Sequence, residues 1–252
     1  MFKKIIFSIC TVLVLFGCEP QKTPTIVASK LVDVVVSEKS KTNSMNAWIK
    51  PYKTALDKIM GVHIGVSSME MSAGLPESLL GTFVTSVMAD YANNHGKKFD
   101  CVITNIGGLR ENLPKGQLTV NEVYKMFPFD NELIILTLSG NNMEELCQII
   151  ASKGGEITSG IEMKIVSSQN KKIGENIKIG GKEINKNRNY KVLTTDYLSF
   201  GNDLMFPMAD YSEIYTFGQP LREIIIDFIK NKHKKGKEIS ASLKNQVYVE
   251  KM

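Results

Sequence analysis

The sequence contains few histidines, which occur only at His63, His95 and His233 among its 252 residues. A catalytic centre with two metal ions needs several converging ligands, and three scattered imidazoles supply little material for one. The hydrophobic share of 43% and the charged share of 23% are otherwise those of an ordinary globular protein. The composition therefore excludes a disordered tail, a collagen and a fibrous array.

Excess charge of one sign is also small. The formal net charge is +5, from 31 Lys and Arg against 26 Asp and Glu, and much of the excess lies in the lysine-rich stretch 230–237. Cations at a helix end suit the helix dipole, whereas a nucleic-acid surface needs more arginine with interleaved aromatic residues. We therefore expect no nucleic-acid partner.

Long apolar runs are scarce as well. One run, from Ile5 to Phe16, follows two lysines, and no second run of membrane length occurs. About twelve apolar residues are too few to cross a bilayer comfortably and are typical of a secretory signal. The ending Leu15-Phe16-Gly17-Cys18 resembles the bacterial lipobox, which implies cleavage after Gly17 and a lipid on Cys18. An ordinary signal peptide with a coincidental cysteine is the alternative.

We therefore expect three parts: a lipoprotein signal peptide over 1–17, a lipidated cysteine and tether over 18–44, and one domain over 45–252. The polar stretch 19–30 carries two prolines and lacks apolar periodicity, which is typical of a tether. The predicted location is the cell envelope, on a bacterial membrane, periplasmic or at the cell surface. In the domain, Cys101 and Cys147 lie in apolar surroundings, so either a disulfide or two buried thiols fits.

Apolar spacing predicts a domain of mixed helices and strands. Helices are expected over 46–60, with Pro51 in its first turns, and over 77–93, 119–126, 142–153 and 221–233. Strands are expected over 63–66, 101–103, 132–139, 161–166, 177–179, 190–195 and 247–249. Because the strands both alternate with helices and meet at turns, the pattern indicates an α+β fold with mixed α/β layers.

Three segments carry residues suited to ligand binding. In 100–110 (DCVITNIGGLR), paired glycines and Arg110 follow a buried strand, which suits close approach of a ligand and contact with phosphate or carboxylate oxygens. In 127–131, Phe129 and Asn131 suit the face and edge of a planar heterocycle. In 190–203, a strand leads into a loop with Tyr197 and Asp203, whose carboxylate can accept hydrogen bonds from ribose hydroxyls. Taken singly, each segment also fits an ordinary turn or core.

Together and in this order, the segments resemble the C-terminal, substrate-binding domain of the 5′-nucleotidase family. The shared motifs are D-x-x-x-x-N-x-G-G-L-R, G-x-L-T-x-x-x-V-x-x-x-x-P-F-x-N and Y-x-V-x-T-x-x-Y/F-x-x-x-G-x-D, and the resemblance covers about residues 45–230. It implies that Phe129 and Tyr197 sandwich a base and that Asn131 touches the edge of the base. It further implies that Asp203 holds the ribose and that Arg110 meets the sugar or the phosphate.

Other positions match the family less closely. A backbone glycine after the helix over 142–153 lines the family's pocket, and Gly155 or its neighbour Gly154 matches it. Glu70 and Gly74 lie where nucleotide-binding members supply further arginines. Each missing charge-assisted contact removes about 1.5–3 kcal/mol of binding free energy for a phosphate, so the resemblance supports nucleoside stacking more strongly than phosphate binding.

The family's metallophosphatase half has no counterpart among the motifs of this sequence, which contains neither a D-x-H nor a G-H-x-H metal-binding motif. We therefore expect no catalytic residue, metal site or cofactor on this chain, and divalent metals on a separate metallophosphatase partner. The predicted function is the substrate-binding half of a split nucleotidase, binding a nucleotide or nucleoside. The alternatives are a non-catalytic lipoprotein that captures nucleosides or binds a protein, and an independent enzyme that uses Asp196 and Asp203.

Overall fold

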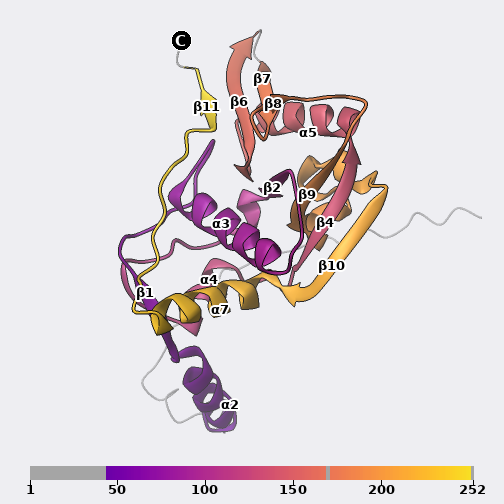
Figure 1. Cartoon of the computed structure of the whole chain (residues 1–252). Coiled ribbons are helices and arrows are strands. Elements are labelled where there is room, and N and C mark those ends of the chain that lie inside the picture. Colours follow the sequence, from indigo (N-terminus) through magenta and orange to yellow (C-terminus); the bar gives the residue numbers. More distant parts are fainter. Residues whose placement is uncertain (1–43, 169–170, 251–252) are drawn as a thin grey trace, which may run out of the picture. The chain divides into compact units, whose positions relative to one another are not determined.

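The computed structural model describes residues 44–168 and 171–250 (Figure 1). The chain divides into two units, 1–50 and 51–252. Of the first unit only the beginning of helix α2 (Ser44–Met60) is described. The predicted signal peptide, Cys18 and nearly all of the predicted tether lie outside the described residues. Within the described ranges, no helix is both long enough and apolar enough to cross a membrane.

Helix α2 begins two residues before the first predicted helix and ends with it. The expectation that Pro51 lies in the first turns is wrong, because the helix starts earlier and Pro51 lies inside it. A proline there offers no N–H to the carbonyl four residues earlier, so one backbone hydrogen bond of the helix is not made. Leu56 and Ile59, on the predicted apolar stripe, are exposed.

The second unit is an α+β domain, as the pattern predicts. Its longer helices are α3 (Leu79–Asn94), α4 (Val120–Met126), α5 (Gly140–Lys153) and α7 (Leu221–Lys234). The capping box from Thr119 to Glu122 forms as predicted, with both reciprocal hydrogen bonds. Ser78 Oγ accepts a hydrogen bond from Gly81 N, and Ser139 Oγ accepts one from Asn142 N. These caps satisfy backbone amides that have no partner inside the helix.

The described strands form three sheets. The smallest pairs β1 (His63–Ser67) with β3 (Gly116–Thr119). The largest has five strands in the order β10 (Glu213–Pro220), β4 (Glu132–Ser139), β9 (Asn189–Thr195), β2 (Cys101–Thr104) and β5 (Ile157–Ser159). The third has the order β11 (Val247–Val249), β6 (Ile161–Ser168), β7 (Lys171–Ile179) and β8 (Lys182–Glu183).

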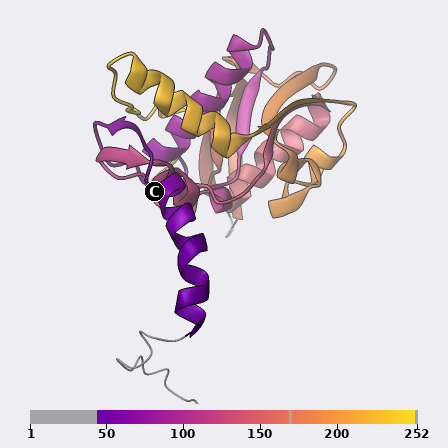
Figure 2. The same ribbon diagram turned by 90° about the horizontal axis from the view of Figure 1, so that it is seen from below.

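The central strands of the five-stranded sheet are buried on both faces. Successive side chains of a strand point to opposite sides, so Val102 joins one hydrophobic cluster while Cys101 and Ile103 join the other. Helices α3 and α7 close the first cluster and α5 closes the second, on opposite sides of the sheet (Figure 2). Burial on both faces explains why these strands are continuous apolar runs in the sequence.

The sequence pattern does not predict β3, β5, β8 or β10, and it predicts only the end of β7. Strand β10 is an edge strand with mostly exposed residues, so no buried face imposes an apolar alternation on it. The first residues of β7 are exposed as well, and β8 has two residues. These strands are held by pairing with neighbours, which leaves little trace in their own composition.

Cys101 and Cys147 are free thiols, and both are buried. Of the two arrangements that the sequence leaves open, the structure has the unpaired one. Burial raises the pKa of Cys147 to about 12 and raises the pKa of Cys101 well above its ordinary value. Since the thiolate is the nucleophilic form, both side chains are inert in the folded protein.

We predict that iodoacetamide at pH 8 modifies neither Cys101 nor Cys147 in the folded protein and modifies both after unfolding in urea. Peptide mapping by mass spectrometry assigns the label to each position. Rapid labelling of the folded protein would contradict the burial. Failure to label in urea without a reductant would show that the two cysteines are oxidised.

Candidate functional site

The three sequence motifs meet at one end of the strands of the five-stranded sheet. Strands β2 and β9 are parallel neighbours, so their carboxyl ends lie at the same end of the sheet. Strand β4 runs antiparallel to β9 and begins at that end, where Leu133 pairs with Thr195. The first motif loop follows β2, the third follows β9, and the second precedes β4. Ligands of sheets with parallel strands commonly bind outside the carboxyl ends of those strands.

These loops surround a cavity of about 160 Å³. Its lining residues are Asn105, Gly107, Gly108, Arg110, Phe129, Asn131, Tyr197 and Asp203. The set includes five of the six side chains or glycines that the sequence nominates for substrate binding, all except Gly155. It also includes Asn105, for which the sequence analysis assigned no role.

Asp203 is the centre of the polar contacts in the cavity. Its Oδ2 accepts a hydrogen bond from Asn105 Nδ2 at 2.6 Å, and its Oδ1 accepts one from the Tyr197 hydroxyl at 3.1 Å. Asp203 belongs to the short 3-10 turn η3 (Asn202–Leu204), and both Asp203 and Leu204 have left-handed backbones, with φ of 54° and 66°. For a leucine this conformation is strained, and strain of this kind is often retained where it places a functional side chain.

Asn105 lies immediately after β2 and is 5% exposed. Its Nδ2 is used by Asp203, whereas its Oδ1 is buried with no hydrogen-bond partner among the described residues. The glycines that follow make room for this amide, since a methyl group on Gly108 would lie 3.2 Å from Asn105 Oδ1 and 3.0 Å from Phe127. An unpaired buried acceptor at a cavity is available to a ligand donor. The paired glycines were the signal in the sequence that could have indicated Asn105.

Arg110 and Phe129 lie together on one side of the cavity. The guanidinium carbon of Arg110 is 5.2 Å from the centre of the Phe129 ring, within the range of a cation–π contact. The backbone N–H of Arg110 donates to Met126 O at 2.8 Å, which joins the glycine turn η2 (Ile106–Gly108) and its following residues to the end of α4. The buried ring of Phe127 meets Phe129 edge to face, with centroids 6.2 Å apart.

The start of helix α7 holds the loop that carries Phe129 and Asn131. Leu221 N donates to Asn131 O at 2.9 Å. Arg222 is buried, forms an ion pair with Asp130 and lies 4.0 Å from the centre of the Tyr124 ring. A planar guanidinium that is stacked and paired in this way fixes the loop between the two predicted contact residues.

Gly155 is the nominated residue that does not line the cavity. Its φ is +122°, and a methyl group there would lie 2.6 Å from Pro76 Cα, so the close approach of Pro76 requires a glycine. Gly154 ends helix α5 with a φ of +88°. The backbone conformation thus explains why glycine occupies both positions. A contact of either glycine with a ligand stays a prediction.

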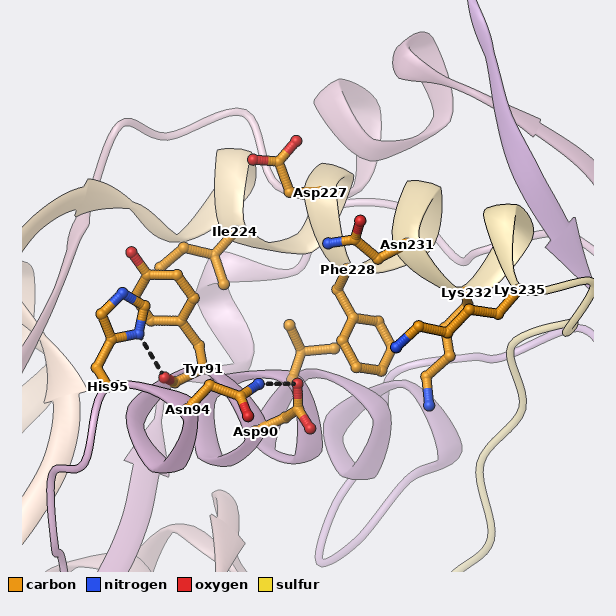
Figure 3. Close-up of a pocket in the computed structure, with 11 residues that line it drawn as sticks. Asp90, Tyr91, Asn94, His95, Ile224, Asp227, Phe228, Asn231, Lys232 and Lys235 are labelled. Atoms are coloured by element: carbon orange, nitrogen blue, oxygen red, sulfur yellow. Dashed lines mark hydrogen bonds between the residues drawn. The ribbon is translucent and has the colours of Figure 1, made fainter.

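A larger cavity of about 610 Å³ lies between α3 and α7 and contains none of the nominated residues (Figure 3). Two of its polar side chains contact residues of α3: Asn94 Nδ2 donates to Asp90 Oδ2 at 3.0 Å, and His95 Nδ1 lies 2.8 Å from Tyr91 O. This groove presents no convergence of sequence motifs, so the smaller cavity is the candidate site.

In residues 44–168 and 171–250, no group of three or more His, Cys, Asp or Glu side chains is placed to hold a metal ion. Asp196, a candidate of the independent-enzyme alternative, uses Oδ1 to accept hydrogen bonds from Glu132 N at 3.0 Å and Tyr197 N at 2.7 Å. Its contacts are those of a residue that joins β4 to the short helix α6 (Asp196–Ser199).

The sequence-family model of the 5′-nucleotidase C-terminal domain matches residues 60–211, which are more than half of the chain. The chain belongs to the 5′-nucleotidase C-terminal domain family. The match contains all three motif loops of the cavity.

Relatives of this 5′-nucleotidase C-terminal domain are longer proteins. A probable 5′-nucleotidase of Treponema pallidum is 29% identical over 141 residues, which are 52% of this chain and 24% of the relative. Cell wall protein Lmo0130 of Listeria monocytogenes is 26% identical over 178 residues, 66% of this chain and 23% of the relative. The chain thus spans about a quarter of these relatives. The crystal structure of a 5′-nucleotidase precursor from Thermus thermophilus has the same fold, with a TM-score of 0.68 and 21% identity, covering 81% of this chain and 42% of that chain.

Tyr197 is a hydrogen-bond donor in the candidate site. Partial burial raises the pKa of its phenol above the ordinary 10.0, and the hydrogen bond to Asp203 and the charge of Asp203 raise it further. Because the folded state favours the protonated phenol, its contribution to stability is complete below the unfolded pKa and is lost as the pH rises through the folded pKa.

We therefore predict that Tyr197 ionises above pH 10.0 in the folded protein. The tyrosinate absorbance of the wild type minus that of Tyr197→Phe, followed in an alkaline titration, isolates this residue. A midpoint at or below the value of free tyrosine would contradict the hydrogen bond to Asp203.

Proposed function

We propose that this chain binds a nucleoside or nucleotide in the cavity around Asp203. The observation that carries the proposal is the convergence of Phe129, Tyr197 and Asp203, from loops far apart in the sequence, on one small cavity. Aromatic rings can stack on a base, the Asn131 amide can bond its edge, and the Asp203 carboxylate can accept hydrogen bonds from ribose hydroxyls. Family membership supports the same ligand class.

The charge of the cavity supports a ligand with little phosphate. Of the residues that line it, Arg110 is the single lysine or arginine. Glu70 and Gly74 replace arginines of nucleotide-binding relatives, as the family resemblance implies. In this proposal Asn105 Oδ1 accepts a hydrogen bond from the ligand, and Arg110 meets the sugar or a single phosphate group.

We further propose that the chain acts as the substrate-binding half of a split nucleotidase. A separate metallophosphatase chain would hold the divalent metals and cleave the phosphate ester, while this chain would hold the nucleoside. Membership in a nucleotidase family without the metallophosphatase motifs supports this division. The lipobox supports attachment to a membrane of the cell envelope through Cys18, and the relative named as a cell wall protein supports a location outside the cytoplasm.

A second candidate is a non-catalytic lipoprotein that captures nucleosides. The specific observation in its favour is the single cation of the cavity, because a nucleoside without phosphate needs no further one. Both candidates require the same stacking contacts and differ in the need for a partner chain.

Removal of either aromatic ring tests nucleoside binding. We predict that Phe129→Ala and Tyr197→Ala each weaken the binding of adenosine or uridine by about 1–3 kcal/mol, the worth of stacking one base on one ring. Isothermal titration calorimetry measures the loss. Phe200→Ala is the matched control, because Phe200 directly follows helix α6, which contains Tyr197, is 77% exposed and does not line the cavity. The absence of any nucleoside binding by the wild type would refute both candidate functions.

The split enzyme is tested by assays with AMP and UDP-glucose in the presence of Mn²⁺. We predict that the purified chain alone gives no turnover, and that it stimulates a metallophosphatase encoded beside it. The variant Tyr197→Ala should give no stimulation. Clear turnover by the chain alone would refute the split-enzyme proposal, and binding without stimulation would favour the capture lipoprotein.

A further inference from the structure

Glu156 is a buried carboxylate that lines neither cavity described above and belongs to none of the three motifs. It follows helix α5 and is 1% exposed. Its Oε2 forms an ion pair with Lys153 Nζ at 2.5 Å, and the lysine is itself 23% exposed. A buried charge is costly unless it is paired and hydrogen-bonded, so the contacts of Glu156 show what keeps it there.

The other carboxylate oxygen of Glu156 holds the glycine turn of the candidate site. Its Oε1 accepts a hydrogen bond from Ile106 N at 2.5 Å and one from Ile157 N at 3.2 Å. Ile106 is the first residue of η2 and lies between Asn105 and Gly107, which both line the cavity. The turn that carries Asn105 is therefore held by a hydrogen bond from Ile106 to a residue 50 positions further along the chain.

Lys153 extends the same contact to the loop of Asp203. Besides the ion pair, its Nζ donates to Asp203 O at 3.4 Å. Since Asn105 Nδ2 donates to the Asp203 carboxylate, the contacts close a ring. The ring runs from Glu156 to the η2 turn, from Asn105 to Asp203, and from Asp203 through Lys153 back to Glu156.

We infer that Glu156 is a positioning residue, which holds Asn105 and Asp203 in the geometry that binds a nucleoside. Both of its oxygens are occupied by Ile106, Ile157 and Lys153, so it acts on a ligand only through these neighbours. Replacing a buried ion pair by apolar residues of similar size often costs little stability, so stability alone does not account for this pair. The inference rests on the proposed nucleoside-binding function.

The test compares two carboxylates that both accept backbone N–H groups. Glu156→Gln removes the charge that pairs with Lys153, and we expect it to weaken adenosine binding about tenfold, the worth of one well-placed hydrogen bond. The matched control is Glu77→Gln, because Glu77 accepts hydrogen bonds from the backbone N–H groups of 245–247, none of which line the cavity. The control should lower the thermal midpoint and leave the Kd for adenosine unchanged.

A second variant provides the test if Glu156→Gln does not fold. Lys153→Met/Glu156→Gln removes both charges, leaves no lone buried ion, and keeps a side-chain oxygen that can accept from Ile106 N and Ile157 N. We expect it to stay folded with a thermal midpoint near that of the wild type and with the same loss of affinity. Hydrogen–deuterium exchange of the segment 104–108 without ligand should be faster in both Glu156 variants than in the wild type and in Glu77→Gln.

The outcomes separate the inference from the proposed function. Wild-type affinity and wild-type exchange in the folded Glu156 variants would overturn the inference and leave the proposed function standing. A wild type that binds no adenosine or uridine would overturn both. A loss of affinity in the Glu156 variants, with the control unchanged, supports both.

Discussion

The pairing of β2 with β9 and of β9 with β4 is the constraint on which the candidate site depends. In the strand register, Cys101 lies opposite Val192 and Leu133 lies opposite Thr195, which brings three loops from distant segments to the same end of the sheet. The register of these three strands is strongly specified because they are buried on both faces. A slip of one residue would move Val102 from one hydrophobic cluster to the other and expose each cluster to the wrong side chains.

On this frame, a small number of polar contacts fixes the loops. Asp203 joins the loop after β9 to Asn105 after β2, and Arg222 joins the start of α7 to the loop before β4 through Asp130. Glu156 and Lys153 add a second link between the loop after β2 and the loop after β9. A site whose contact residues are held by neighbours of this kind is formed before a ligand arrives, which lowers the entropy that binding must overcome.

Much of the candidate site could be predicted because its residues lie in short motifs beside recognisable strands. Arg110, Phe129, Asn131, Tyr197 and Asp203 all line one cavity. The residues that sequence analysis missed, Asn105 and Glu156, act through partners far away in the chain. Gly155 was nominated from its family position, and its contact with a ligand stays a prediction; the structure adds its close approach to Pro76, a contact that no local pattern could indicate.

By itself, the sequence determined the longer helices, most of the buried strands and the order of the motifs, because apolar periodicity and caps act over a few residues. Only the tertiary structure decided the order of the strands, the exposed edge strand β10 and the unpaired state of Cys101 and Cys147. It also decided the hydrogen bond between Asn105 and Asp203, which are 98 positions apart. The physical reason is that hydrogen bonds and packing between distant segments depend on where the chain returns, and a local pattern of residues does not encode that return.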